Sequence, residues 1–214
     1  MRHIYLFSGL GVDHRAFQNI DFSGFEVTFI EWIMPTDNES LPAYASRLAQ
    51  QIRHKKFMLV GVSFGGMIAV EIAKILSPEK TILISSAKTS TEIPSPFRFS
   101  GRLRLHYLIP KRLLKKPNWI NYKLFGITDQ RNKRLLDDIL QDTDPHFFKW
   151  AMTQIVLWKN KTIPDNVVHI HGTDDKILPY RFVACDIRIE HGGHFMVVDK
   201  ADELNPILRN LLAG

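Results

Sequence analysis

The sequence is short of cysteine, since its 214 residues include one, Cys185. This excludes an intrachain disulfide and any zinc site built from several thiolates. No apolar run reaches the length of about 18 residues that a transmembrane helix needs, and residues 3–7 are too short for the apolar part of a signal peptide. The phosphate-loop motif G-x-x-x-x-G-K-[ST] is also absent. The composition is that of a globular protein, which we expect to be cytoplasmic.

Short apolar runs recur along the chain and alternate with helical stretches. The expected strands are His3–Phe7, Glu26–Ile30, Phe57–Val62, Lys80–Ser85, Val167–His171 and Asp186–Glu190. The expected helices of the same region are Leu41–Ile52 with Ser40 as its N-cap, Phe64–Leu76, and Asp202–Leu212. Nearly continuous apolar strands are typical of parallel sheets that are covered on both faces. The pattern predicts an α/β protein with a doubly wound, mostly parallel sheet of about six strands.

One connection is much longer than a crossover between parallel strands requires. Residues 87–165 contain no convincing strand but carry two helix-start signals, one at Thr128 or Asp129 and one at Asp144-Pro145. We expect these residues to form a helical lid, inserted into a core that comprises residues 1–86 and 166–214.

A glycine-flanked serine lies between an apolar strand and an apolar helix, in Gly61-Val62-Ser63-Phe64-Gly65. G-x-S-x-G in this setting is typical of a nucleophile elbow, a strained turn that projects the serine hydroxyl away from the sheet. Neighbouring backbone comes so close to such a turn that glycine is needed on either side. An accidental glycine-rich turn or a phosphate-binding loop is the alternative for this motif taken alone.

The elbow requires an acid and a histidine later in the chain, each after its own strand. Two aspartates, Asp174 and Asp175, follow the fifth expected strand, and two histidines, His191 and His194, follow the sixth. The order serine, acid, histidine is the order that accompanies this kind of elbow. The sequence therefore predicts a catalytic triad and offers two candidates for each of its last two members.

Together these features resemble the α/β-hydrolase superfamily, in particular its small lidded serine esterases and thioesterases. The resemblance covers the chain except for the lid. In that family the acid ends a G-x-x-D pattern with a proline soon after, and the histidine follows a turn of small residues. The resemblance therefore implies a triad of Ser63, Asp175 and His194, with Asp174 and His191 as the competing choices.

The same resemblance implies an oxyanion hole formed by the backbone N–H groups of Leu10 and Phe64. The family usually has histidine where this chain has Ser8, so the support of this loop differs here.

The implied function is hydrolysis of an acyl ester or thioester through an acyl-enzyme, which requires no metal and no cofactor. C–C bond hydrolases and acyltransferases share the triad. A non-catalytic ligand-binding protein of the same fold is the alternative from another class.

The formal charge of +6 is unevenly distributed. From Lys88 to Arg134, twelve basic residues stand against two acidic ones, so this segment carries +10 and the rest of the chain −4. The charges either keep a lid soluble or steer an anionic or carrier-bound acyl substrate toward the site. The aromatic candidates for lining a substrate pocket are Phe97, Tyr107, Trp119 and Trp150. We expect no nucleic-acid partner and no stable membrane insertion, because no motif for either occurs.

Overall fold

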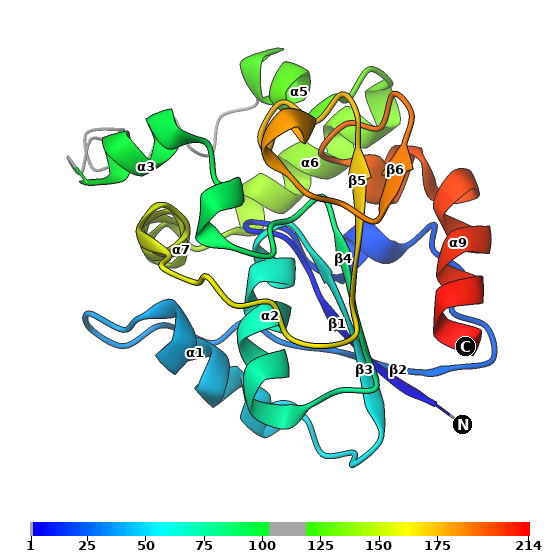
Figure 1. Cartoon of the computed structure of the whole chain (residues 1–214). Coiled ribbons are helices and arrows are strands. Elements are labelled where there is room, and N and C mark those ends of the chain that lie inside the picture. Colours follow the sequence, from blue (N-terminus) through cyan, green and yellow to red (C-terminus); the bar gives the residue numbers. More distant parts are fainter. Residues whose placement is uncertain (1, 103–118) are drawn as a thin grey trace.

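The computed structural model describes residues 2–102 and 119–214, and a parallel sheet lies at its centre (Figure 1). Six strands follow the order β2-β1-β3-β4-β5-β6, and every neighbouring pair is parallel. The strands are β1 (His3–Phe7), β2 (Glu26–Phe29), β3 (Phe57–Val62), β4 (Lys80–Ile84), β5 (Val167–Gly172) and β6 (Ile187–Ile189). All six expected strands are confirmed to within one residue at each end, and the sheet is wholly parallel.

The apolar strands serve two cores at once. Side chains alternate across a strand, so in β1 Ile4 and Leu6 join the core on one face of the sheet, while Tyr5 and Phe7 join the core on the other. All four side chains are at most 1% exposed. This explains why the strand reads as a continuous apolar run rather than an alternating one.

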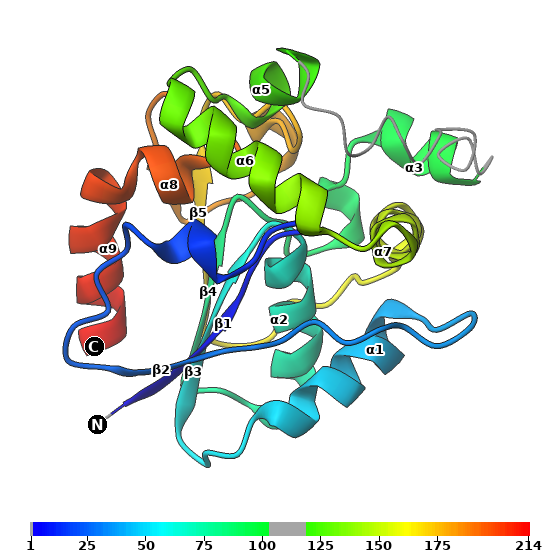
Figure 2. The same ribbon diagram turned by 180° about the vertical axis from the view of Figure 1, so that it is seen from behind.

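Helices cover both faces of the sheet (Figures 1 and 2). One face packs against α1 (Leu41–Leu48) and α2 (Phe64–Leu76), and the other against α8 (Met196–Asp199) and α9 (Ala201–Ala213). The Ser40 hydroxyl caps α1 by accepting the Ala43 N–H at 3.4 Å. The three residues after Leu48 continue as a 3₁₀ turn, so the expected longer helix ends in a tightened last turn.

The long connection between β4 and β5 is helical in its described parts. It contains α3 (Ser95–Arg102), α5 (Trp119–Phe125), α6 (Gln130–Asp142) and α7 (Pro145–Leu157). Asp129, rather than Thr128, caps α6, and Asp144 caps α7; each carboxylate accepts two backbone N–H groups of the first turn. These helices gather near the carboxyl ends of the strands (Figures 1 and 2). Across the described ranges, no helix combines the length and apolarity needed to cross a bilayer.

The first and last described residues of the chain meet near the amino ends of the strands. The Arg2 guanidinium donates to the carbonyl groups of Leu212 and Ala213 at 2.8 and 2.6 Å. Figure 1 shows both ends on the side away from α5 and α6. The two ends of the chain therefore lie near the amino ends of the strands, and the helices of the long connection lie near the carboxyl ends.

Candidate active site

Ser63 occupies the turn from β3 into α2. Its φ of 51° and ψ of −120° lie in a region that residues other than glycine rarely adopt. The end of β4 and the loop after it hold this turn from one side. The Ser63 N–H donates to the Ile84 carbonyl at 2.9 Å, and the Ser86 hydroxyl donates to the Ser63 carbonyl at 2.6 Å. A strained serine backbone is thus fixed by its neighbours, as a nucleophile elbow requires.

The two glycines of the elbow motif sit against backbone atoms. A Cβ atom on Gly65 would collide with the carbonyl oxygens of Phe7 and Ser8, and one on Gly61 would lie 2.6 Å from the Gly65 oxygen. No larger residue fits at either position without moving β1 or the elbow. The expected reason for the glycines is therefore confirmed.

Three side chains from three different loops form one hydrogen-bonded series. His194 Nε2 lies 2.8 Å from Ser63 Oγ, and His194 Nδ1 lies 2.7 Å from Asp175 Oδ2. A carboxylate at Nδ1 holds the ring proton there, which leaves Nε2 free to accept the serine hydroxyl proton. The structure therefore brings Ser63, Asp175 and His194 together in the geometry of a triad.

The Asp175 carboxylate is almost fully buried and held from two sides. Its Oδ1 accepts the N–H groups of Ile177 and Leu178 at 2.9 and 2.8 Å, while Oδ2 faces His194. Burial acts to raise the pKa of Asp175, but the charge of His194 and its hydrogen bond, assisted by His171 and the Leu178 N–H, bring the pKa below its ordinary value. Asp175 is therefore ionised at neutral pH and oriented toward the imidazole.

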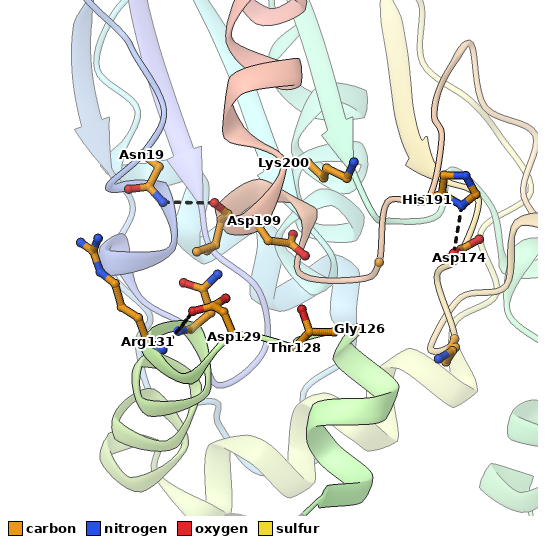
Figure 3. Close-up of a pocket in the computed structure, with 13 residues that line it drawn as sticks. Asn19, Gly126, Thr128, Asp129, Arg131, Asp174, His191, Asp199 and Lys200 are labelled. Carbon is orange, nitrogen blue, oxygen red and sulfur yellow. Dashed lines mark hydrogen bonds and ion pairs between the residues drawn. The ribbon is translucent and has the colours of Figure 1, made fainter.

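The competing acid and histidine lie outside this series. Asp174 and His191 face each other at 3.5 Å, with side chains 56% and 84% exposed. They border a cleft of about 690 Å³, across which lie Thr128, Asp129 and Arg131 (Figure 3). The geometry selects Asp175 and His194 over this exposed pair.

Strand β5 carries two further histidines, His169 and His171, which the sequence analysis did not single out; His171 is the one next to Asp175. The His171 Nε2–H donates to the Leu178 carbonyl at 2.7 Å and lies 3.5 Å from Asp175 Oδ2, while His171 Nδ1 is 3.2 Å from His169 Nε2. Burial lowers the pKa of both rings, that of His169 well below its ordinary value. Both are therefore neutral at neutral pH. The signal for them is the period of two, which puts both on one face of β5.

The residues expected to form the oxyanion hole flank Ser63. Leu10 lies in a turn closed by the Val12 N–H, which donates to the Gly9 carbonyl at 3.1 Å. Gly11, which follows Leu10, has a φ of 70°, as the third position of a type II turn requires. A Cβ on Gly9 would lie 3.4 Å from Ser63 Cβ, so the turn is beside the nucleophile.

Phe64, the other expected donor, is the first residue of α2. Its N–H has no acceptor within the helix. The hydroxyl of Ser8, which stands where the family usually has histidine, accepts the indole N–H of Trp32 at 3.0 Å.

The four aromatic candidates have different positions. Phe97 and Trp119 are 46% and 69% exposed, and Tyr107 lies outside the described residues. Trp150 is half-buried; its indole N–H donates to the Glu39 carbonyl at 2.9 Å. An aromatic ring that does contact the triad belongs to Phe125 of α5, whose centroid is 5.7 Å from that of His194 in an edge-on arrangement.

One group of side chains has the composition of a metal site. His3, Glu26 and His54, at the amino ends of the strands, have ligand atoms within 4.8 Å of one another. However, the two imidazole rings stack at 3.7 Å with an interplanar angle of 18°. Their in-plane lone pairs therefore lie in two nearly parallel planes, one ring thickness apart, and do not converge on one ion. This arrangement does not fit a preformed metal centre.

A parallel sheet whose third strand ends in a strained serine, with an acid after the fifth strand and a histidine after the sixth, defines the α/β-hydrolase architecture. The model of a family described as the alpha/beta hydrolase family matches residues 7–207. The chain belongs to this family, and membership supports hydrolase activity.

Solved structures agree with this fold. An esterase from Thermogutta terrifontis has a TM-score of 0.72 at 17% identity, with 100% of this chain and 90% of that chain covered. For an esterase from Exiguobacterium antarcticum the TM-score is 0.72 at 14% identity, covering 100% and 92%. A bromoperoxidase from Bacillus anthracis has a TM-score of 0.69 at 17% identity, with 100% of this chain and 92% of that chain covered. At such identities the likeness establishes the fold alone. No curated protein sequence matches the chain.

Proposed function

We propose that this protein is a serine hydrolase that cleaves an acyl ester or thioester through an acyl-enzyme intermediate. The observation that carries the proposal is the hydrogen-bonded series from Asp175 through His194 to Ser63, which ends on a strained turn. A serine hydroxyl is a weak nucleophile unless an adjacent base removes its proton, and the series supplies such a base in the correct tautomer.

In the proposed mechanism Ser63 Oγ attacks the acyl carbonyl carbon as its proton moves to His194 Nε2. Asp175 stabilises the imidazolium that forms. The N–H groups of Leu10 and Phe64 bind the oxyanion of the tetrahedral intermediate, and each such donor contributes roughly 3 kcal/mol in other enzymes. His194 then returns the proton to the leaving oxygen or sulfur. Water hydrolyses the acyl-enzyme in a second round, with His194 as the general base.

Labelling with a fluorophosphonate probe tests the proposal directly. The wild type should be modified at Ser63, and Ser63→Ala and His194→Ala should not be labelled. His191→Ala is the matched control and should be labelled like the wild type, because His191 lies outside the series. A wild type that resists the probe would overturn the enzyme proposal and favour a ligand-binding protein that retains the fold.

We propose that the acyl chain lies beside the turn that contains Leu10. A cavity of about 220 Å³ is bordered by Gly11 of that turn and by the apolar side chains of Val12, Trp32, Ile33 and Phe147. Asp13, Asp142 and Asp144 also border it, so the cavity suits a neutral acyl chain rather than an anionic one. This volume is below the range of roughly 300–1,000 Å³ that accommodates drug-sized ligands. We therefore place a short acyl chain there. Esters and thioesters of increasing acyl length should show the highest kcat/KM at short chains, and Val12→Phe should lower kcat/KM for the longer ones first.

The basic segment is proposed to attract an anionic or carrier-bound substrate. Of its described side chains, Lys123, Arg131 and Arg134 are exposed, whereas Lys88 is buried against Asp186 at 3.5 Å and does not contribute to the surface charge. Because salt screens exposed charges, added salt should lower kcat/KM for an anionic acyl ester and leave a neutral ester of equal size unchanged. Equal salt responses would assign the charges to solubility. We further propose a cytoplasmic location, which the sequence composition favours.

A further inference from the structure

The side chain of Trp32 contacts Ser8, which precedes the turn of Leu10, and Phe64, the other proposed oxyanion donor. Trp32 follows β2 and is half-buried. Its indole N–H donates to the Ser8 hydroxyl at 3.0 Å. Its ring lies 5.5 Å from the ring of Phe64 and 5.6 Å from that of Phe147. One indole thus joins the end of β1, the start of α2 and the start of α7.

Ser8 is the point through which this contact reaches the oxyanion turn. It is 6% exposed and directly precedes the turn that begins at Gly9. Its backbone carbonyl packs against Gly65 of the elbow, where no Cβ atom fits. The Ser8 backbone is therefore confined by the elbow, and the bond to Trp32 fixes its hydroxyl. Loss of that bond would leave the buried hydroxyl without the indole donor and would loosen the start of the turn.

We infer that Trp32 is a positioning residue for the oxyanion hole, an inference that rests on the proposed function. It holds the Leu10 turn through the Ser8 hydroxyl and holds Phe64 through ring packing. Oxyanion donors act at distances of about 2.7–3.1 Å from an oxygen whose charge develops in the transition state. A small displacement of either donor therefore lowers kcat without changing how the ground-state substrate binds.

A double-mutant cycle tests this inference. Trp32→Phe keeps an apolar ring but removes the N–H donor, and Ser8→Ala removes its acceptor. Each variant should lower kcat by about tenfold. Ser8→Ala should do so at unchanged KM, whereas Trp32 also borders the proposed acyl cavity, so Trp32→Phe is compared by its kcat. The double variant should be no slower than either single variant, since both remove the same bond. The inhibition constant of a trifluoromethyl ketone, which forms a tetrahedral oxyanion adduct with the serine, should rise by the same factor as kcat/KM falls.

Trp158→Phe provides the matched control. This variant also removes a buried indole N–H, which donates to Glu71 Oε1 at 2.7 Å. Trp158 has no hydrogen bond to Ser8, Ser63, Asp175 or His194. This variant should lower the Tm and leave kcat unchanged.

The inference is overturned if Trp32→Phe and Ser8→Ala keep the wild-type kcat, if they raise only KM, or if their losses multiply in the double variant. Ser8→Ala decides the question alone if circular dichroism shows that Trp32→Phe is unfolded. Failure of the proposed function would look different, because the wild type itself would then show neither turnover nor fluorophosphonate labelling.

Discussion

Two acid–histidine pairs follow β5 and β6, and they are close neighbours in the sequence. Asp175 and His194 lie 2.7 Å apart and are 3% and 4% exposed. Asp174 and His191 lie 3.5 Å apart, with side chains 56% and 84% exposed. The residue types are identical, and the acids are adjacent. What distinguishes the pairs is that one faces inward, where its hydrogen bonds are shielded from water, and the other faces the solvent.

Shielding changes what the same two groups can do. An exposed ion pair contributes about 0–1 kcal/mol because water competes for both partners. The buried carboxylate has two backbone N–H groups and one imidazole as fixed partners, and the surrounding low dielectric strengthens these interactions. The buried pair can therefore hold one tautomer and one orientation, which a general base requires. Four predictions test this contrast.

The largest difference is expected between the two histidines. His194→Ala should lower kcat for a p-nitrophenyl ester by about 10⁴–10⁶-fold, because the serine loses its base. His191→Ala should stay within about twofold of the wild type. Similar losses for both variants would mean that the exposed pair takes part in catalysis.

A smaller but still large difference is expected between the two acids. Asp175→Asn keeps the shape of the side chain but no longer fixes the imidazole tautomer, and it should lower kcat by about 10⁴-fold. Asp174→Asn should leave kcat unchanged. Steady-state kinetics at pH 7.5 measures both, and equal effects would contradict the assignment of the acid.

The loops that carry both pairs touch at Gly172, so one substitution should affect the whole region. A Cβ on Gly172 would collide with the Gly192 carbonyl oxygen. Gly172→Ala should therefore lower the free energy of unfolding by about 1–3 kcal/mol, as overpacking does, and should lower kcat as well. Gly24→Ala is the control: it meets no atom within 4 Å and bears only the strain of a φ of 90°. Urea unfolding would compare the two, and equal losses would show that backbone strain alone accounts for the effect.

The smallest effect concerns pH and the buried histidines behind the acid. Their folded pKa values lie below the unfolded value of about 6.5. The folded state therefore binds fewer protons, and stability is lost as pH falls below about 6.5. The Tm of the wild type should drop between pH 7.5 and 5, and His169→Asn should flatten that drop. His191→Asn, which changes an exposed ring, should leave the slope unchanged; a flattened slope there would contradict the role of burial.

Much of the fold could be predicted because local signals agree with the tertiary structure. The strands are unbroken apolar runs, and Ser40, Asp129 and Asp144 cap helices at the expected places. The short helices α3 and α5 were missed, since they have eight and seven residues and a period of 3.6 residues repeats only about twice in that length. α8 was missed because it is a single turn directly after the histidine loop.

Some residues of the candidate site could likewise be predicted from the sequence, and others could not. Ser63 was found from a motif that reports a backbone requirement, and Asp175 and His194 from family spacing. The family pattern already favoured Asp175 and His194 over Asp174 and His191. What it does not contain is burial, and the structure adds that the favoured pair is buried and the competing pair exposed. Trp32 could not be found at all, because its partner Ser8 is 24 residues away and a hydrogen bond between two loop side chains follows no sequence period.

The bond from Arg2 to the carbonyls of the last helix has a practical consequence. Both ends of the described chain lie near the amino ends of the strands, and the candidate site lies at the carboxyl ends. A tether attached at either end would therefore anchor the molecule to a bead or an electrode with Ser63 turned outward. For the same reason, a few flexible residues would suffice to join Arg2 to Ala213, which makes the fold a natural candidate for a circular permutant opened in a loop far from the triad.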